Sequence, residues 1–169
     1  MGAVSYEVPS PSDAEELLTF FSALKDEHPY LHIYPDDALQ SVGDLGHYIR
    51  RMNAAEGSHI LVAKDDQRIV GCVTVEALTL EGFQGAGELG ISVLKGYRDR
   101  GIGSRLMREM LAWATGNTHT TEIILHVDGE NHRAVHIYTG LGFQVEDCGE
   151  GEYYRRDSPA GTLCMRLSV

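Results

Sequence analysis

The feature that most constrains the fold lies near the middle of the chain, where a glycine-rich turn separates a strand-like run from a helical one. The strand-like run is "GELGISVL" (residues 87–94), the turn is "GYRDRGIGS" (residues 96–104), and "SRLMREMLAWA" (residues 104–114) has the apolar spacing of a helix. In this order, the backbone N–H groups of the helix N-terminus can bind a phosphate. The sequence therefore predicts an anion-binding turn inside a domain of mixed strands and helices.

Positive charge gathers around the same turn, although the chain as a whole is acidic. The 169 residues carry a formal net charge of −11, yet one short stretch contains Lys95, Arg98, Arg100, Arg105 and Arg108. We therefore expect an anion to bind there. The acidic excess argues against a nucleic-acid partner, which would require a basic face. It fits a cationic partner such as an amine or polyamine, and it also fits a protein that its charge merely keeps soluble.

The sequence shows no signal for a membrane or for secretion. No apolar run approaches the roughly 18 to 20 residues of a membrane helix, and the N-terminus lacks a basic segment followed by an apolar one. We expect a cytoplasmic protein with no membrane partner. Cys72, Cys148 and Cys164 are an odd number without CxxC spacing, so we expect ordinary, mostly buried residues rather than a disulfide framework or a zinc site.

Two familiar phosphate loops do not fit the turn. The Walker pattern G-x-x-x-x-G-K-[ST] needs a lysine where Ile102 stands and a hydroxyl where Gly103 stands. Without the lysine, the turn does not fit a nucleotide-dependent kinase. The dinucleotide pattern G-x-G-x-x-G finds its first two glycines in Gly101 and Gly103, but its third position is Leu106.

A third pattern, R/Q-x-x-G-x-G/A, is met in full by Arg98, Gly101 and Gly103. Its glycines let the backbone approach a pyrophosphate closely and adopt left-handed angles. With its surroundings, "ELGISVLKGYRDRGIGSRLMREMLAWA" followed by "ILHVDGENHRAVHIYTGLGFQVE", this turn resembles the GNAT family of N-acetyltransferases over residues 86–148. The first stretch resembles the acetyl-CoA motif (about 86–116), and the second resembles the motif that follows it (about 121–148).

The resemblance and the pattern of segments together predict the architecture. Helical and strand-like segments alternate in the order ααβββαβαββ, which indicates an α/β (α+β) domain with a mixed sheet. The resemblance implies a mostly antiparallel sheet of about six to seven strands with helices on both faces. Over residues 1–85 the likeness is one of topology only. We expect one acetyltransferase domain over residues 1–169.

The resemblance also implies an activity, the transfer of an acetyl group from acetyl-CoA to a primary amine by direct attack in a ternary complex. A small cationic amine is the first expectation for the acceptor, and a protein N-terminus or lysine is the alternative. A different class of function, a CoA-binding sensor without turnover, also stays open. The expected cosubstrate is acetyl-CoA, no metal is expected, and a homodimer is compatible with the family.

The same resemblance assigns residues to the cosubstrate. The pantetheine arm would lie along the backbone of Ile91, Ser92 and Val93 and contact Asn131, which is otherwise a plain helix cap. Arg133 would meet the ribose phosphate. The pyrophosphate would lie on the turn itself, formed by Arg98, Asp99, Arg100, Gly101, Ile102, Gly103 and Ser104.

Acetyl transfer to an amine needs a base and an acid. An alkylamine of pKa near ~10.4 is almost fully protonated at pH 7, and deprotonating it costs about 4 to 5 kcal/mol. Glu88 is the first candidate for the base, and the weaker candidates are Glu122, His126 and Asp128. Tyr138 resembles the family's general acid, which would protonate the departing thiolate. It could instead be a packing tyrosine.

The segment "HPYLHIYPDD" (residues 28–37) lies where the family shapes its acceptor pocket. There Tyr30, His32 and Tyr34 could surround a cationic amine, although a surface loop with anchoring aromatics is the alternative. His132 and His136 have the i, i+4 spacing of zinc ligands, but Arg133 stands where a metalloprotease has its glutamate. We therefore expect no metal site.

Overall fold

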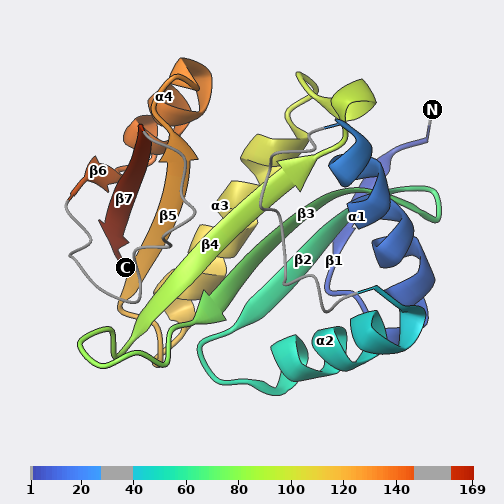
Figure 1. The fold of residues 1–169 in the computed structure, drawn as a ribbon, viewed down its shortest axis with the longest axis horizontal. Coiled ribbons are helices and arrows are strands. Elements are labelled where there is room, and N and C mark those ends of the chain that lie inside the picture. The colour runs from blue at the N-terminus through green and yellow to red at the C-terminus, as the bar shows by residue number, and fades with distance from the viewer. Residues whose placement is uncertain (1, 28–39, 147–160) are drawn as a thin grey trace.

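The computed structural model describes residues 2–27, 40–146 and 161–169. These residues form a seven-stranded sheet in the order β1-β2-β3-β4-β5-β7-β6 (Figure 1). The strands are β1 (Val4–Glu7), β2 (His59–Asp65), β3 (Arg68–Ala77), β4 (Ala86–Val93), β5 (Glu122–Asp128), β6 (Gln144–Val145) and β7 (Thr162–Ser168). The helices are α1 (Ala14–Glu27), α2 (Val42–Ala54), α3 (Ile102–Gly116) and α4 (His132–Gly140), with 3-10 turns η1 (Pro11–Asp13) and η2 (Lys95–Tyr97).

Capping side chains determine where the first two helical segments begin. The backbone N–H of Ser10 donates to Asp13 Oδ2 at 2.9 Å just before η1 and α1. At the start of α2, Ser41 and Asp44 exchange two such bonds, each 3.1 Å long. A cap of this kind stabilises a helix by about 1 kcal/mol. The helical segments therefore begin at Pro11 and at Val42.

One parallel pair interrupts an otherwise antiparallel sheet. Strand β4 pairs with β5 in parallel, and α3 forms the crossover between them. The other neighbouring strands pair antiparallel. This arrangement confirms the predicted mixed, mostly antiparallel sheet, and it brings the carboxyl end of β4 and the turn after it to the same end of the molecule as α4 (Figure 1).

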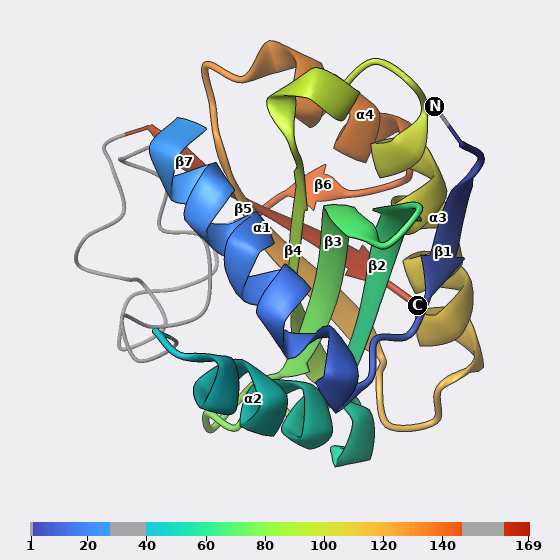
Figure 2. The ribbon, with the colours of Figure 1, turned by 90° about the vertical axis from the view of Figure 1, so that its right-hand side faces the viewer.

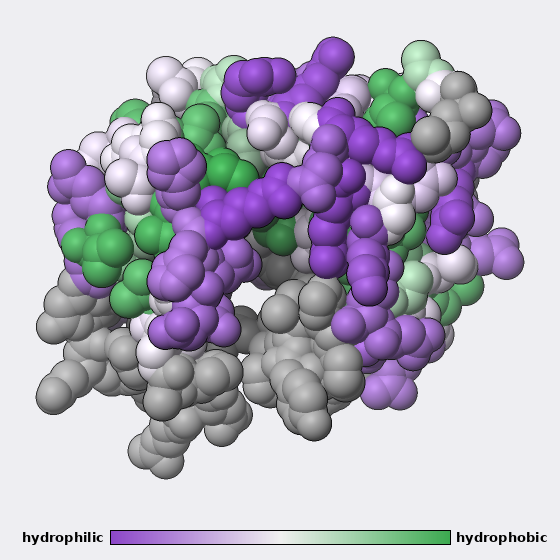
Figure 3. All heavy atoms as spheres, turned by 90° about the horizontal axis from the view of Figure 1, so that it is seen from above, coloured by the Kyte–Doolittle hydropathy of each residue, from purple (hydrophilic) through white to green (hydrophobic). Residues whose placement is uncertain are grey.

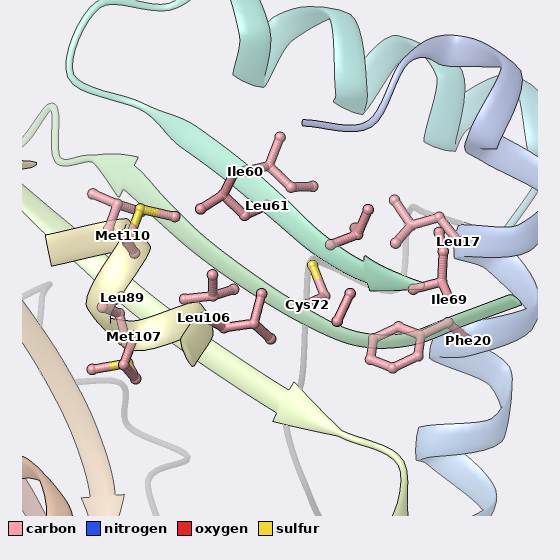
Figure 4. Close-up of a cluster of buried hydrophobic side chains, with 14 of the residues drawn as sticks. Leu17, Phe20, Ile60, Leu61, Ile69, Cys72, Leu89, Leu106, Met107 and Met110 are labelled. Carbon is pink, nitrogen blue, oxygen red and sulfur yellow. The ribbon is translucent and has the colours of Figure 1, made fainter. Parts of the chain in front are cut away.

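The two faces of the sheet are covered by different helices (Figure 2). A Cβ placed on Gly71 of β3 would lie 3.1 Å from Leu106 and 3.3 Å from Ile102, so this face of β3 packs against α3. Side chains alternate along a strand, so Thr74 and Glu76 point to the opposite face, where α1 and α2 lie. Figure 4 shows the core where side chains of α1, α3 and the central strands meet.

The first strand is absent from the sequence prediction. β1 has four residues, of which Val4 and Tyr6 are half-buried, and it pairs with one edge of β2. Such a short alternation carries little signal by itself, because its stability comes from the strand that it joins. The sheet therefore begins one strand earlier than the predicted order.

The cysteines differ in their surroundings. Cys72 is free and buried, and burial raises the pKa of its thiol to about 12. Cys164 of β7 is disulfide-bonded, so the expectation of three ordinary cysteines was wrong for this residue.

Among the helices that the structure describes, none combines the length and the hydropathy of a bilayer crossing.

Candidate active site

Strands β4 and β5 separate partway along their length, and this splay is the centre of the candidate site. They pair only where Ala86–Glu88 of β4 faces Glu122–Ile124 of β5. Beyond Glu88, β4 continues beside β3 as far as Val93, and β5 continues beside β7. The edge of β4 that faces β5 therefore has no strand partner over this stretch of the described chain. Unpaired backbone groups at a strand edge can bind an extended ligand.

The residues predicted to hold the pantetheine arm lie on this stretch. Ile91, Ser92 and Val93 are half-exposed and follow the last residue of β4 that pairs with β5. Strand β4 keeps an unshifted register with β3 from Gly87 to Val93. The splay alone opens the strand edge in this chain.

The glycine turn ends in a left-handed residue at the start of α3. Gly101 caps this helix with φ 78°, and Asp99 has φ 65°. Positive φ angles are the conformations for which glycine has no steric penalty, and Asp tolerates them better than most residues. The first bond of the helix runs from the N–H of Arg105 to the carbonyl of Gly101 at 3.0 Å. The N–H groups that precede Arg105 in α3 form the positive end of the helix, which favours an anion.

The arginines of the turn have protein partners. Arg98 Nε donates to the carbonyl oxygen of Val93 at 2.9 Å, and Arg98 Nη2 lies 3.3 Å from Glu27 Oε2. Glu27 also accepts from the backbone N–H of Lys95 at 3.0 Å. Arg98 thus ties the turn to the end of β4 and to α1. The guanidinium of Arg100 lies 5.0 Å from the centre of the Tyr97 ring.

An ion pair joins the two motifs on either side of the splay. Arg133, in the first turn of α4, contacts the carboxylate of Asp99 in the glycine turn. The hydrogen bond from Arg133 holds the pKa of Asp99 below its usual range, and Asp99 in turn raises the pKa of Arg133. Figure 3 looks onto this end of the molecule and shows hydrophilic residues on both sides of a recess.

A carboxylate and an imidazole face each other where the strands part. His126 Nδ1 lies 3.6 Å from Glu88 Oε1, and the side chains are 24% and 28% exposed, respectively. Glu88 belongs to the last pair between β4 and β5, and His126 lies two residues beyond its partner Ile124 on the same face. The sequence ranked Glu88 first and His126 behind it, but the structure brings the two together. Only the parallel register, which the sequence does not contain, could have shown this.

The two other candidates for the base have structural partners. Arg166 of β7 donates to both oxygens of Glu122 at 2.7 and 2.6 Å. Asp128 accepts from the backbone N–H of Glu130 at 2.9 Å in the turn before α4. These contacts leave Glu88 and His126 as the stronger pair.

Helix α4 carries the predicted acid. Asn131 caps this helix by accepting from the N–H of Ala134 at 3.2 Å. Tyr138 lies two turns further along, so the two residues occupy the same side of the helix. Its ring packs edge-on against Phe143 with centroids 6.0 Å apart. Burial raises the pKa of the Tyr138 phenol, so it keeps its proton at neutral pH.

The predicted acceptor residues Tyr30, His32 and Tyr34 lie outside the described residues. Across residues 2–27, 40–146 and 161–169, no group of three or more His, Cys, Asp or Glu side chains is arranged to hold a metal ion.

The sequence is similar to those of known acetyltransferases. The family model for the acetyltransferase (GNAT) family matches residues 15–143. The chain is 30% identical over 109 residues to the L-amino acid N-acetyltransferase AaaT of Escherichia coli, covering 61% of this chain and 67% of that protein. It is 35% identical over 99 residues to the N-alpha-acetyltransferase RimI of Mycobacterium tuberculosis, covering 52% of this chain and 59% of RimI.

Solved structures support the same fold. An acetyltransferase of the GNAT family from Streptococcus pneumoniae superposes with a TM-score of 0.84 at 24% identity, covering 99% of this chain and 100% of the other. The yncA protein of Salmonella typhimurium, whose structure contains its cofactor acetyl-CoA, gives a TM-score of 0.72 at 16% identity, covering 99% and 94%. At these identities the likeness concerns the fold. Since the family model spans most of the chain, from α1 to Phe143, this protein belongs to the GNAT acetyltransferase family and is an acyl-CoA-dependent N-acyltransferase.

Proposed function

We propose that residues 1–169 act as one acetyltransferase domain that transfers the acetyl group of acetyl-CoA to a primary amine, by direct attack in a ternary complex. The observation that carries this proposal is the splay between β4 and β5. It supplies an open strand edge that leads to the anion-binding turn at one end. At the other end, it places Glu88 beside His126.

The strand edge and the turn fit the two ends of the cosubstrate. The backbone of Ile91, Ser92 and Val93 would hydrogen-bond the pantetheine amides, with Asn131 beside the arm. The pyrophosphate would accept from the turn and from the N–H groups of Ile102, Gly103 and Ser104 at the positive end of α3. Arg100 and Arg133 would add positive charge, and Arg98 would hold the turn in shape through Val93 and Glu27.

Glu88 and His126 would remove the proton that the acceptor amine must lose. A carboxylate 3.6 Å from an imidazole nitrogen can stabilise the protonated ring, so the pair can accept a proton directly or through a water molecule. Neither side chain is fully buried, which gives the proton a route to solvent.

Tyr138 would protonate the sulfur of the departing thiolate. Burial raises the pKa of its phenol, so the proton needed for this step is present throughout the neutral range. The ring packs against Phe143, and α4 lies on the β5 side of the splay (Figure 1).

A small cationic amine is the proposed acceptor, because the chain is acidic overall and the proposed general base, Glu88 with His126, includes a carboxylate. A protein N-terminus or lysine is the second candidate, since the chain is similar both to an L-amino acid N-acetyltransferase and to an N-alpha-acetyltransferase. Tyr30, His32 and Tyr34 are proposed to contribute to the acceptor pocket.

The decisive experiment is a thiol-release assay with acetyl-CoA, run across small amines, amino acids and peptides with free N-termini. We expect release with at least one of these amines. In Tyr138→Phe, kcat should fall about 100-fold while the KM for acetyl-CoA stays unchanged. Tyr6→Phe, on the far edge of the sheet, is the matched control and should keep full activity. CoA binding without release from any amine would favour a sensor instead.

The proton acceptor is tested by the pH profile. Glu88→Gln and His126→Gln should each move the optimum of kcat/KM to higher pH, because the acceptor must then lose its proton to solvent. If the two residues act as one unit, the double variant should be little worse than either single variant. An unshifted profile in both single variants would remove the pair from this role.

A further inference from the structure

A buried hydroxyl on β3 has no hydrogen-bond partner among the residues that the structure describes. Thr74 is 2% exposed, and its Oγ1 is without a partner. Leaving such a group unpaired costs about 1 to 3 kcal/mol, and a valine would fill the same space without that cost. A threonine here therefore needs a reason beyond packing.

The position of Thr74 relates it to the splay. Thr74 lies directly across from Gly90 of β4, and Glu76 lies across from Glu88. Because the strands are in regular register, Thr74, Glu76 and Glu88 all point to the face that carries α1 and α2. Gly90 is half-exposed and has no side chain, so the position of β4 directly opposite Thr74 contributes no side chain around the hydroxyl. A glycine inside a strand often marks the close approach of a ligand.

The charges around this position select one kind of ligand. Glu76 is paired with Arg51 of α2, whose Nη1 lies 2.5 Å from Glu76 Oε1. This pair is neutral as a unit. Glu88 faces His126 across 3.6 Å, so beside a neutral imidazole the Glu88 carboxylate leaves one net negative charge. Thr74 lies opposite Gly90, so Glu88 is its diagonal neighbour, and such positions are about 7 to 8 Å apart, within the reach of a glutamate side chain.

We propose that Thr74 binds the acceptor, and that its hydroxyl and the Glu88 carboxylate together accept hydrogen bonds from an acceptor that arrives as a primary ammonium group. The Glu76–Arg51 pair closes the subsite on the side of α2. An acceptor with one positive charge near its amine balances the local charge, whereas one with a carboxylate beside the amine does not. This inference rests on the proposed function, because it assigns the acceptor side of the same site.

The test uses the isosteric variant Thr74→Val, with Thr74→Ser as the matched control that keeps the hydroxyl. We expect Thr74→Val to raise the KM of the acceptor about tenfold, since a hydrogen bond to a charged group is lost. The KM of acetyl-CoA should stay unchanged. The melting temperature should stay the same or rise by a few degrees, because a buried unpaired hydroxyl has been removed. Thr74→Ser should keep the acceptor KM within about twofold of the parent.

An unchanged acceptor KM in Thr74→Val would contradict the inference. If Thr74→Val raises the melting temperature and leaves the acceptor KM unchanged, the hydroxyl has no part in binding and the inference is wrong. Thr74→Ala is used in the same way if the valine variant does not fold. Absence of thiol release from the parent protein would instead overturn the proposed function, so the two failures are distinguishable. A further arm compares an amino acid with its amide, and we expect the lower KM for the amide.

Discussion

The two sides of the splay are built differently. On the N-terminal side, β1 to β4 are covered by α1, α2 and α3, each of which buries five residues in the core. On the C-terminal side, β5, β7 and the two-residue β6 carry α4, which has no fully buried residue. The N-terminal side is a platform held by packing. The C-terminal side, called the flap below, buries strand residues such as Ile123 and Met165, but its helix is only partly buried. It holds two of the proposed catalytic side chains.

This division matches what each side would contribute to the reaction. The platform offers the backbone edge of β4 and the helix end of α3, which must be rigid to be pre-organised for a long, flexible cosubstrate. The C-terminal side offers His126 and Tyr138, whose side chains are proposed to act on the amine and the thiolate. Glu88 lies at the junction, in the last pair that joins the two sides.

The largest effect that would test this contrast is on stability. Leu106 of α3 is completely buried, so Leu106→Ala should lower the free energy of unfolding by about 3 kcal/mol. Val135 of α4 is half-buried, and Val135→Ala should cost about 1 kcal/mol. Both are measured by urea denaturation. Equal losses in the two variants would contradict the contrast between a packed platform and a flap whose helix is only partly buried.

The next largest expected loss of stability comes from removing a buried ion pair near the β1 edge of the platform. Lys64 Nζ donates to Glu7 Oε1 at 2.5 Å and to Asp13 Oδ1 at 2.7 Å, and its side chain is 8% exposed. Lys64→Met removes the charge but keeps the length of the side chain. We expect a loss of about 2 to 3 kcal/mol, moderated because Glu7 reaches solvent. Since this cluster is remote from the splay, kcat of the folded enzyme should stay unchanged.

The pH dependence of that loss follows from the shifted groups. Burial alone would raise the pKa of Asp13, but hydrogen bonds from Lys64 and Ser10 outweigh it and lower the pKa. Burial alone would lower the pKa of Lys64, but its two carboxylates raise it. Asp13 therefore stabilises the fold above about pH 4, and Lys64 does so below about pH 10. The difference in the free energy of unfolding between the parent and Lys64→Met should be largest between these two pH values and smaller outside them.

The sequence predicted the platform better than the flap. The glycine turn with its flanking strand and helix, and the order of the elements after β1, follow from local patterns, and the structure has them as predicted. The splay and the meeting of Glu88 with His126 depend on which strands pair and in what register, which no local pattern contains. The sequence could not single out Thr74, because an unpaired hydroxyl is recognised only when its surroundings are known.

The smallest effect concerns the ion pair that joins the two sides, between Asp99 and Arg133. Both side chains are largely exposed, at 64% and 68%, so the pair should add little to stability, and Asp99→Asn should leave the melting temperature within about 1 °C of the parent. Asparagine also accepts the left-handed backbone of this position, which has φ 65°.

Asp99→Asn should also change the binding of acetyl-CoA. Asp99→Asn removes a negative charge from the turn and frees Arg133 for the phosphates, so the KM for acetyl-CoA should fall about two- to threefold at low salt. Arg133→Ala should raise this KM instead, and both differences should fade as salt is added to about 0.5 M, because exposed charges are then screened. A higher KM in Asp99→Asn would show that Asp99 holds Arg133 in its binding position. The Asp99–Arg133 pair would then support the binding of acetyl-CoA, rather than compete with its phosphates for Arg133.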